Sequence, residues 1–335
     1  MNKPCVFFGE LLLRLGAPGH ELLTQSPRLD VHYGGAEANV ATGLAHLGHS
    51  CRMASFVPAN ALGRSAKATL RGRGVDCSAV VERPGRMGLY FLETGAGPRA
   101  SAIIYDRERS AFAMAGPADI DWPKLLDGAR LLHLSGITCA LGAESSAMAL
   151  EGARVARSLG VTVSFDVNYR ASLWERWGGD SATIIGTMMD ASDVLFANHV
   201  DFSLVSGQKF NPNDDPDDRA AAMAFERWPN LKLIASTIRN IASAEHHRLA
   251  GQVYARDAAH RTDALELTGI VDRIGAGDAF ATGVLHGFLK QNSLKVMAET
   301  GIALAALKHT LPGDASLFSQ ADIDAFVAGT RDVRR

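Results

Sequence analysis

Short, continuous runs of apolar residues alternate along this chain with longer segments of helical pattern, and this alternation restricts the fold more than any other feature. The clearest apolar runs are Val6–Phe8, Arg52–Phe56, Leu131–Leu134, Thr162–Asp166, Val194–Ala197 and Leu233–Ser236. The clearest helical segments are Ala36–Leu47, Ser145–Leu159, Asp217–Trp228, Asp278–Lys290 and Leu294–Lys308. Strands buried on both faces read as continuous apolar runs. The order of elements therefore predicts an α/β fold in which helices flank a mostly parallel central sheet.

Two segments, about 11–33 and 87–107, interrupt this alternation. They contain short runs of period-two character, such as Gly88–Leu92 and Ala102–Tyr105, bounded by Gly, Pro or Arg. Such runs are typical of strands. We interpret them as antiparallel strands outside the main sheet that form a small β-sheet lid. The chain is thus predicted to be a single domain over 1–335, with the lid strands contributed by these two segments.

Composition and charge exclude several classes of partner. The chain has 335 residues, 47% of them hydrophobic and 21% charged, and a formal net charge of −2. This charge provides no broad positive field for nucleic acid or for an acidic membrane surface, and no segment approaches the ~20 apolar residues of a membrane helix. The cysteines, Cys5, Cys51, Cys77 and Cys139, form no C-x-x-C pair, which favours free thiols in a reducing cytoplasm. We expect a cytoplasmic protein without nucleic-acid or membrane partners.

The segment Gly275-Ala-Gly-Asp278 directly precedes a strong helical pattern. Its glycines let the backbone approach a ligand closely, and the following helix points its free N–H groups and positive dipole end at the same place. We predict that Gly275, Ala276 and Gly277 form an anion hole for a phosphoryl group. Asp278 beside it is the candidate base that deprotonates an attacking hydroxyl. On its own, the segment fits a glycine turn with a helix cap equally well.

Other nucleotide and hydrolase motifs are missing from the sequence. It has no G-x-x-x-x-G-K-S/T, no G-x-G-x-x-G, no H-E-x-x-H and no G-x-S-x-G. These patterns mark P-loop enzymes, dinucleotide-binding folds, zinc proteases and serine hydrolases. Their absence leaves the Gly275–Asp278 segment as the main chemical signal.

Two signatures together resemble the ribokinase-like (PfkB-type) carbohydrate kinase family. They are Gly34-Gly-Ala-Glu-Ala-Asn-Val-Ala41 and Asp272-Arg-Ile-Gly-Ala-Gly-Asp-Ala-Phe280. The resemblance covers nearly the whole chain and implies a ribokinase-like fold and an ATP-dependent kinase. The branch it resembles most is that of 2-keto-3-deoxygluconate kinases. The segments that support this branch are Gly88–Tyr90, Tyr105–Arg107, Asp166–Arg170 with Leu173-Trp174, and Lys308–Asp314.

The resemblance implies a set of substrate-binding residues. Tyr90, Tyr105 and Arg107 would contact the sugar acid, Arg170 would lie between sugar and nucleotide, and Asp314 would hold a sugar hydroxyl. Independently, a keto acid carries a carboxylate, which suits the planar fork of an arginine. Without the motif, each arginine is more often a solvated charge, and each tyrosine serves lid packing or a dimer contact about as often as a ligand.

The early glycines and the asparagine after them are further candidates. Gly34 and Gly35 stand between a predicted strand and a helix, where the backbone is able to approach a substrate hydroxyl; a simple strand–helix turn is the alternative. Asn39 lies one helical turn beyond. Its amide is suited either to bond the sugar or to pin the lid hinge.

On the nucleotide side, Asn168, Asn198, Ser236 and Arg239 are expected to bind ATP. The family's Lys-x-Gly after the strand that we predict to end at Ser236 is replaced here by Ala235-Ser-Thr-Ile-Arg-Asn240. The family's Asn-x-x-Glu appears as Asn198-His-Val-Asp201, so Asp201 is expected to hold Mg²⁺ through water. Arg273-Ile274 replaces the usual Thr, and we predict no monovalent-cation site.

The predicted function is transfer of the ATP γ-phosphate to the terminal hydroxyl of a sugar acid, 2-keto-3-deoxygluconate or a close stereoisomer, with Mg²⁺. One alternative is a kinase for a neutral sugar such as fructose or ribose. The other is a non-catalytic sugar-binding regulator on the same fold. A small lid has unpaired edges that a second copy would cover, so we expect a homodimer formed through the lid.

Overall fold

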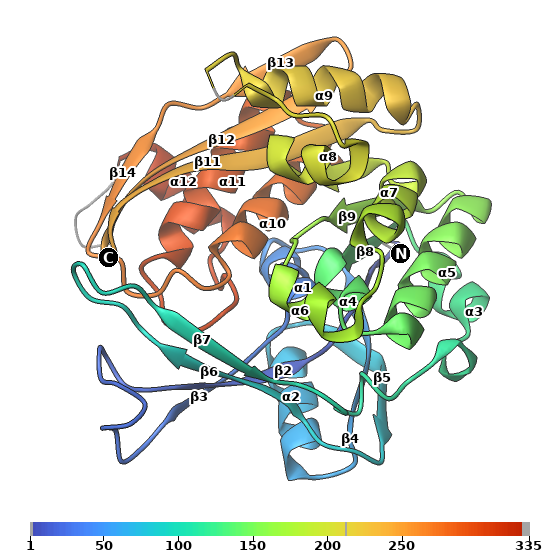
Figure 1. The fold of residues 1–335 in the computed structure, drawn as a ribbon, viewed down its shortest axis with the longest axis vertical. Coiled ribbons are helices and arrows are strands. Elements are labelled where there is room, and N and C mark those ends of the chain that lie inside the picture. The colour runs from blue at the N-terminus through green and yellow to red at the C-terminus, as the bar shows by residue number, and fades with distance from the viewer. Residues whose placement is uncertain (1–2, 212, 330–335) are drawn as a thin grey trace.

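The computed structural model describes residues 3–211 and 213–329, and the strands of these segments form a ten-stranded sheet and a separate four-stranded sheet (Figure 1). The large sheet has the order β13-β12-β11-β10-β9-β8-β1-β4-β5, and β14 also pairs with β12. Its strands are β1 Cys5–Phe8, β4 Cys51–Pro58, β5 Asp76–Arg83, β8 Leu131–Ser135, β9 Thr162–Asp166, β10 Val194–Phe196, β11 Leu233–Ser243, β12 His246–Ala255, β13 Ala258–Arg261 and β14 Leu265–Thr268.

The large sheet is parallel from β5 to β11 and antiparallel beyond it. The expectation of a mostly parallel sheet flanked by helices is confirmed, and each predicted apolar run coincides with a strand except that Ala197 lies just beyond β10. The helices are α1 Ala36–His46, α2 Ala61–Gly72, α3 Trp122–Leu126, α4 Gly136–Cys139, α5 Ala143–Ser158, α6 Ala171–Trp177, α7 Ser181–Ala191, α8 His199–Ser206, α9 Pro216–Arg227, α10 Ala276–Leu289, α11 Leu294–Lys308 and α12 Gln320–Val327.

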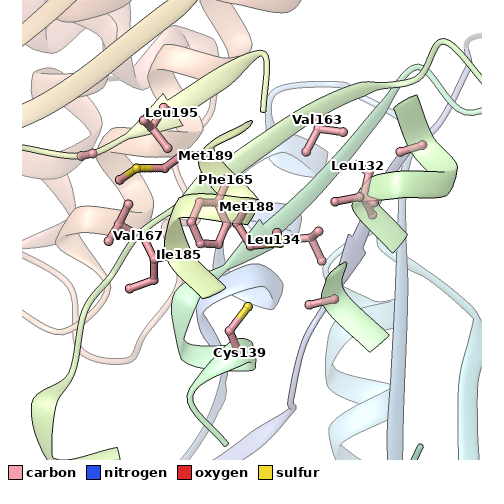
Figure 2. Close-up of a cluster of buried hydrophobic side chains, with 14 of the residues drawn as sticks. Leu132, Leu134, Cys139, Val163, Phe165, Val167, Ile185, Met188, Met189 and Leu195 are labelled. Atoms are coloured by element: carbon pink, nitrogen blue, oxygen red, sulfur yellow. The ribbon is translucent and has the colours of Figure 1, made fainter. Parts of the chain in front are cut away.

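Two hydrophobic clusters cover the two faces of the large sheet. Successive residues of a strand point to opposite faces, so Phe8 belongs to the cluster under α3, α5, α7 and α9, whereas Phe7 belongs to the cluster under α1, α2, α10 and α11. In the first cluster, Leu134 and Phe165 of neighbouring strands lie close to Met188 of α7 (Figure 2). The burial of both faces explains why these strands read as unbroken apolar runs.

The small sheet is the predicted lid, and one of its pairings differs from expectation. It consists of β2 Leu12–Gly16, β3 Asp30–Gly34, β6 Gly88–Glu93 and β7 Ala102–Asp106, in the order β3-β2-β6-β7. The pairs β2–β3 and β6–β7 are antiparallel, but β2 and β6 pair in parallel. Our prediction of a fully antiparallel lid was therefore wrong. The chain returns through β4 and β5 of the main sheet before β6, so it enters the lid twice in the same direction.

None of the helices within residues 3–211 and 213–329 has both the length and the apolar character that crossing a membrane requires. The four cysteines are all buried and unpaired.

Candidate active site

A cavity of about 640 Å³ opens between the lid and the carboxyl ends of the parallel strands. Open α/β sheets bind their ligands at this edge. The cavity lining includes every residue that the sequence predicted for the site except Gly34: Gly35, Asn39, Tyr90, Tyr105, Arg107, Asn168, Arg170, Asn198, Asp201, Ser236, Arg239, Gly275, Ala276, Gly277, Asp278 and Asp314. Gly34 lies just behind, because a Cβ atom there would come within 2.3 Å of Asp314 Oδ2.

The turn at Gly275 begins α10 and places Asp278 in the first helical turn. Gly275 has φ 76°, and a Cβ atom on it would lie 1.6 Å from the Asp314 carbonyl oxygen, so no other residue fits. A Cβ atom on Gly277 would meet nothing within 4 Å, which leaves the backbone open to the cavity. The first N–H groups of a helix have no helical acceptor. Among them, Ala276 donates a long bond of 3.3 Å to the Arg273 carbonyl.

The Asp278 carboxyl group is held by Asn39 and has an unusual pKa. Asn39 Nδ2 donates to Asp278 Oδ2 at 2.7 Å. Desolvation raises the pKa of Asp278 to about 7, with smaller contributions from Asp314 and Glu37, while the bond from Asn39 acts in the opposite direction. A general base works best when its pKa lies near the working pH. Asn39 therefore orients the candidate base in this structure.

Asp166, at the end of β9, is a cavity residue to which sequence reasoning gave no role. Desolvation, followed by the charges of Asp278 and Asp201, raises the pKa of Asp166 to about 8. Like charges that share a site disfavour simultaneous ionisation. Asp166 lies in the Asp166–Arg170 segment that carried the family resemblance, so its motif was visible, but its neighbour Asp278 is far away in the sequence.

The raised pKa of Asp166 predicts a pH-dependent stability. The folded protein retains a proton on this group at pH values where the unfolded chain, with a pKa near 3.8, has lost it. This contribution to stability is fully present below the unfolded pKa and is lost as the pH rises through about 8. We predict that the melting temperature of the ligand-free protein falls between pH 5 and pH 8 and that Asp166→Asn reduces this fall. An unchanged slope in the variant would contradict the assignment.

Asp314 belongs to a buried polar network that joins the lid to the late loops. It accepts a hydrogen bond from the Tyr90 hydroxyl, and Arg14 Nη1 lies 3.1 Å from Asp314 Oδ1. Arg14 also donates through Nη2 to Asp272 Oδ2 at 2.7 Å. Burial raises the pKa of Tyr90, with Asp314 as a further cause, so the phenol stays protonated and donates. The sequence gave no role to Arg14 or to the carboxylate of Asp272.

Arg107 lines the cavity with its charge already paired. Its Nε and Nη2 atoms lie 2.8 Å and 2.6 Å from Glu10 Oε2, and both side chains are buried. Ser110 also donates to Glu10, which fixes the carboxylate. The guanidinium carbon lies 5.9 Å from the centre of the Tyr105 ring. Glu10 is the second residue after β1 and was missed, because its partner comes from the lid segment 97 positions later.

Three arginines that line the cavity have no carboxylate partner in the described ranges, Arg170, Arg239 and Arg273. Desolvation lowers the pKa of Arg239, and the charges of Arg273 and Arg170 add to this effect. Ser236 and Arg239 lie inside β11, which continues to Ser243. The prediction that this strand ends at Ser236 was wrong, because pairing with β12 extends it beyond the buried core. Arg273 is a cavity residue with no predicted role.

Asn198 and Asp201 cap α8 reciprocally. The Asn198 side chain accepts from the Val200 and Asp201 amides, and the Asn198 amide donates to Asp201 Oδ2 at 2.9 Å. Desolvation raises the pKa of Asp201 to about 6. The described part of the chain contains no group of three His, Cys, Asp or Glu side chains placed to hold a metal ion.

The pfkB family carbohydrate kinase model matches residues 2–321. The chain belongs to this family. A 2-dehydro-3-deoxygalactonokinase from Haloferax volcanii is 29% identical over 98% of both chains, and a 2-dehydro-3-deoxygluconokinase from Bacillus subtilis is 29% identical over 100% of this chain and 98% of that protein. The crystal structure of a 2-dehydro-3-deoxygluconokinase from Thermotoga maritima is 38% identical, with a TM-score of 0.92 over 98% of this chain and 99% of that one. The resemblance inferred from the two signatures is confirmed.

Proposed function

We propose that this kinase transfers the γ-phosphate of ATP to the terminal hydroxyl of 2-keto-3-deoxygluconate, giving 2-keto-3-deoxy-6-phosphogluconate. The observation that carries the proposal is the position of Asp278, at the start of α10 and in one cavity with the lid tyrosines and the arginines. The Bacillus subtilis and Thermotoga maritima relatives are named for this substrate, which is also called 2-dehydro-3-deoxygluconate. The Haloferax volcanii relative is named for the galactonate-derived isomer.

In this mechanism, Asp278 takes the proton of the terminal hydroxyl as its oxygen attacks the γ-phosphorus of ATP. The bond to the leaving ADP breaks in line with this attack. The Gly277 amide and its neighbours in the first turn of α10 donate to the phosphoryl oxygens. Asn39 donates to the Asp278 carboxylate and so restricts its orientation. A pKa near 7 makes Asp278 a stronger base than an exposed aspartate while a substantial fraction of it is ionised at neutral pH.

Recognition of the sugar acid falls to the lid end of the cavity. Asp314 and Tyr90 are buried acceptor and donor groups suited to sugar hydroxyls, and Gly35 leaves the backbone accessible beside them. Arg170 and Arg107 attract the carboxylate. Because Glu10 already neutralises Arg107, Arg107 contributes through a fixed orientation of its remaining N–H groups and Arg170 contributes most of the charge.

The nucleotide end of the cavity supplies cationic groups for the ATP phosphates. Arg239 and Arg273 lie there without carboxylate partners among the residues described, and Asn168, Asn198 and Ser236 offer hydrogen-bonding groups. Mg²⁺ bound with the phosphates would neutralise part of their charge, and Asp201 would hold it through water. Since ATP is an intracellular substrate and all four cysteines are free thiols, we place the reaction in the cytoplasm.

An ADP-release assay on a panel of substrates tests this function. We expect turnover with 2-keto-3-deoxygluconate and slower turnover with 2-keto-3-deoxygalactonate, fructose and ribose. A preference for fructose or ribose would replace the sugar-acid assignment by a neutral-sugar kinase. Thermal-shift binding of a sugar acid without any ADP release would replace the kinase by a non-catalytic binding protein.

The role of Asp278 is tested by Asp278→Asn. Loss of a general base lowers turnover by about 10²–10⁴-fold, so we expect kcat to fall in this range while calorimetry shows sugar and nucleotide binding close to the original. Asp180→Asn is the control, because Asp180 is an exposed cap of α7 that Asn replaces well. Near-normal turnover in Asp278→Asn would remove this residue from the mechanism.

The role of Arg107 is tested by Arg107→Ala. Loss of a charge-assisted hydrogen bond costs about 1.5–3 kcal/mol, so we expect the KM for the sugar acid to rise by roughly 10–100-fold with a smaller change in kcat. Arg86→Ala is the matched control, since Arg86 forms an exposed ion pair with Asp106 at the same end of the lid. An unchanged KM would exclude a substrate contact at Arg107.

We also propose that two copies pair through the outer faces of their lids. Cross-strand neighbours Val31, Leu15, Phe91 and Ile104 form one apolar row over all four lid strands. Val31 and Ile104 are 53% and 58% exposed at its two ends. An apolar row on a sheet without covering helices favours a self-complementary contact around a two-fold axis.

Sedimentation tests the dimer. We expect the unmodified chain to sediment as a dimer and Ile104→Glu to sediment as a monomer, because a charge in a desolvated interface is unfavourable. Val81→Glu is the control, since Val81 is 48% exposed on β5 of the main sheet, away from the lid. A chain that is monomeric before any substitution would refute the lid contact.

A further inference from the structure

Lys308, the last residue of α11, carries a positive charge in the interior of the protein. Its side chain is fully buried, with 0% exposure. The ammonium donates to two backbone carbonyls, Leu311 at 2.8 Å and Asp272 at 3.2 Å. Among the described residues, no carboxylate oxygen lies within ion-pair distance of it. A lysine is seldom fully buried unless it is paired, and here carbonyl dipoles take the place of a counter-ion.

This burial has a cost that a neutral side chain would avoid. Taking an ammonium out of water is unfavourable unless hydrogen bonds compensate it. Desolvation accordingly lowers the pKa of Lys308 to about 8, so at neutral pH the group remains mostly charged. An apolar side chain of similar length would fill the same space without this penalty. The apolar side chain would not, however, attract the two carbonyl oxygens that the Lys308 ammonium binds.

The two carbonyls belong to the two loops that build the centre of the proposed site. Asp272 precedes the turn at Gly275, and Leu311 precedes Asp314. The loops are in direct contact, because the Gly313 amide donates to Asp272 Oδ2 at 3.0 Å and Gly275 packs on the Asp314 carbonyl. The other oxygen of Asp272 accepts from the Ile274 amide at 2.9 Å. The ammonium thus lies beneath the junction of the phosphate-binding turn and the sugar-binding loop.

We propose that Lys308 is a positioning residue, whose ammonium draws the Asp272 and Leu311 carbonyls together and so holds the phosphate-binding turn at a fixed distance from Asp314. A metal cation bound between the two carbonyl oxygens would hold the loops together in the same way, but here the cation is the ammonium group of a side chain. The proposal rests on the proposed function for its catalytic consequence, but the clamp between the loops is a property of the ligand-free protein.

Charged groups from each packed element act on this ammonium. Asp272, Asp314 and Asp278 favour its charged form, whereas Arg14 from the lid disfavours it. The neighbouring His309 has a pKa lowered chiefly by burial and is neutral at the working pH. As the pH rises through about 8, Lys308 loses its proton, and the attraction for the two carbonyls weakens.

The first experiment measures amide hydrogen exchange of the ligand-free protein and of Lys308→Met, a buried apolar replacement of similar length. We expect faster exchange confined to the loops 271–278 and 309–316. Lys295→Met is the matched control, because Lys295 is an exposed lysine of the same helix that pairs with Glu299 on the surface. Unchanged exchange in both loops, or an increase spread evenly over the protein, would overturn the clamp. No substrate is needed, so the result stands whatever the enzyme phosphorylates.

The second experiment tests the catalytic consequence with Lys308→Ala. Displacement of reacting groups by about 1 Å costs on the order of 100-fold, so we expect kcat to fall by roughly 10–100-fold. Ammonium chloride should restore about tenfold of this loss, whereas tetramethylammonium chloride at equal ionic strength, too large for the site, should not. Lys308→Arg should keep more activity at pH 9 relative to pH 7 than the unmodified chain. Normal kcat in Lys308→Ala, or a loss that ammonium leaves unchanged, would overturn the catalytic role.

The outcomes separate the two proposals. If the unmodified chain phosphorylates no sugar acid but Lys308→Met loosens the two loops, the proposed function fails and the clamp stands. If the unmodified chain is an active sugar-acid kinase but the loops exchange as before in Lys308→Met, the clamp fails and the function stands.

Discussion

The close contact between the turn at Gly275 and the backbone of Asp314 is the constraint on which the site depends. It brings the N-terminus of α10, which carries the candidate base, against the loop that carries the candidate sugar ligand. A left-handed glycine is needed for this approach, because any Cβ atom would collide with the Asp314 carbonyl. The Asp272 carboxylate then binds both loops through backbone amides. Catalytic geometry in this protein is therefore set by the backbone more than by side-chain packing.

The second organising feature is the distribution of charge around the cavity. Acidic groups gather in it, where Asp166 and Asp278 have raised pKa values because burial and neighbouring carboxylates disfavour their ionised forms. The cavity also holds arginines that have no carboxylate partner among the residues described. Neither arrangement stabilises the ligand-free fold, since one brings buried carboxyl groups together and the other leaves cations without carboxylate partners. The phosphates of a nucleotide would pair with the arginines, and a substrate hydroxyl would donate to the ionised carboxylate. The cavity is thus complementary to its ligands at the expense of the stability of the ligand-free fold.

The fold and most of the cavity lining were predictable from the sequence, for identifiable reasons. Continuous apolar runs reveal strands buried on both faces, and the glycine turn before α10 indicates an anion site within a few consecutive residues. The partners of the polar residues were not predictable in the same way. Arg107 pairs with Glu10, 97 positions away in the sequence, and Arg14 pairs with Asp272, 258 positions away. Such pairs depend on how the lid docks on the main sheet, and no local pattern records that arrangement.

The path of the chain from the lid into the main body has a mechanical consequence. Strand β3 passes through Gly34 and Gly35 directly into α1, whose Asn39 holds Asp278. Strand β2, its partner, carries Arg14 to the loop of Asp314. The lid and the residue that orients the candidate base, Asn39, therefore belong to one continuous segment of the chain. In the proposed mechanism, a displacement of the lid relative to the main body would therefore be transmitted through Gly34 and Gly35 to the helix that holds Asp278.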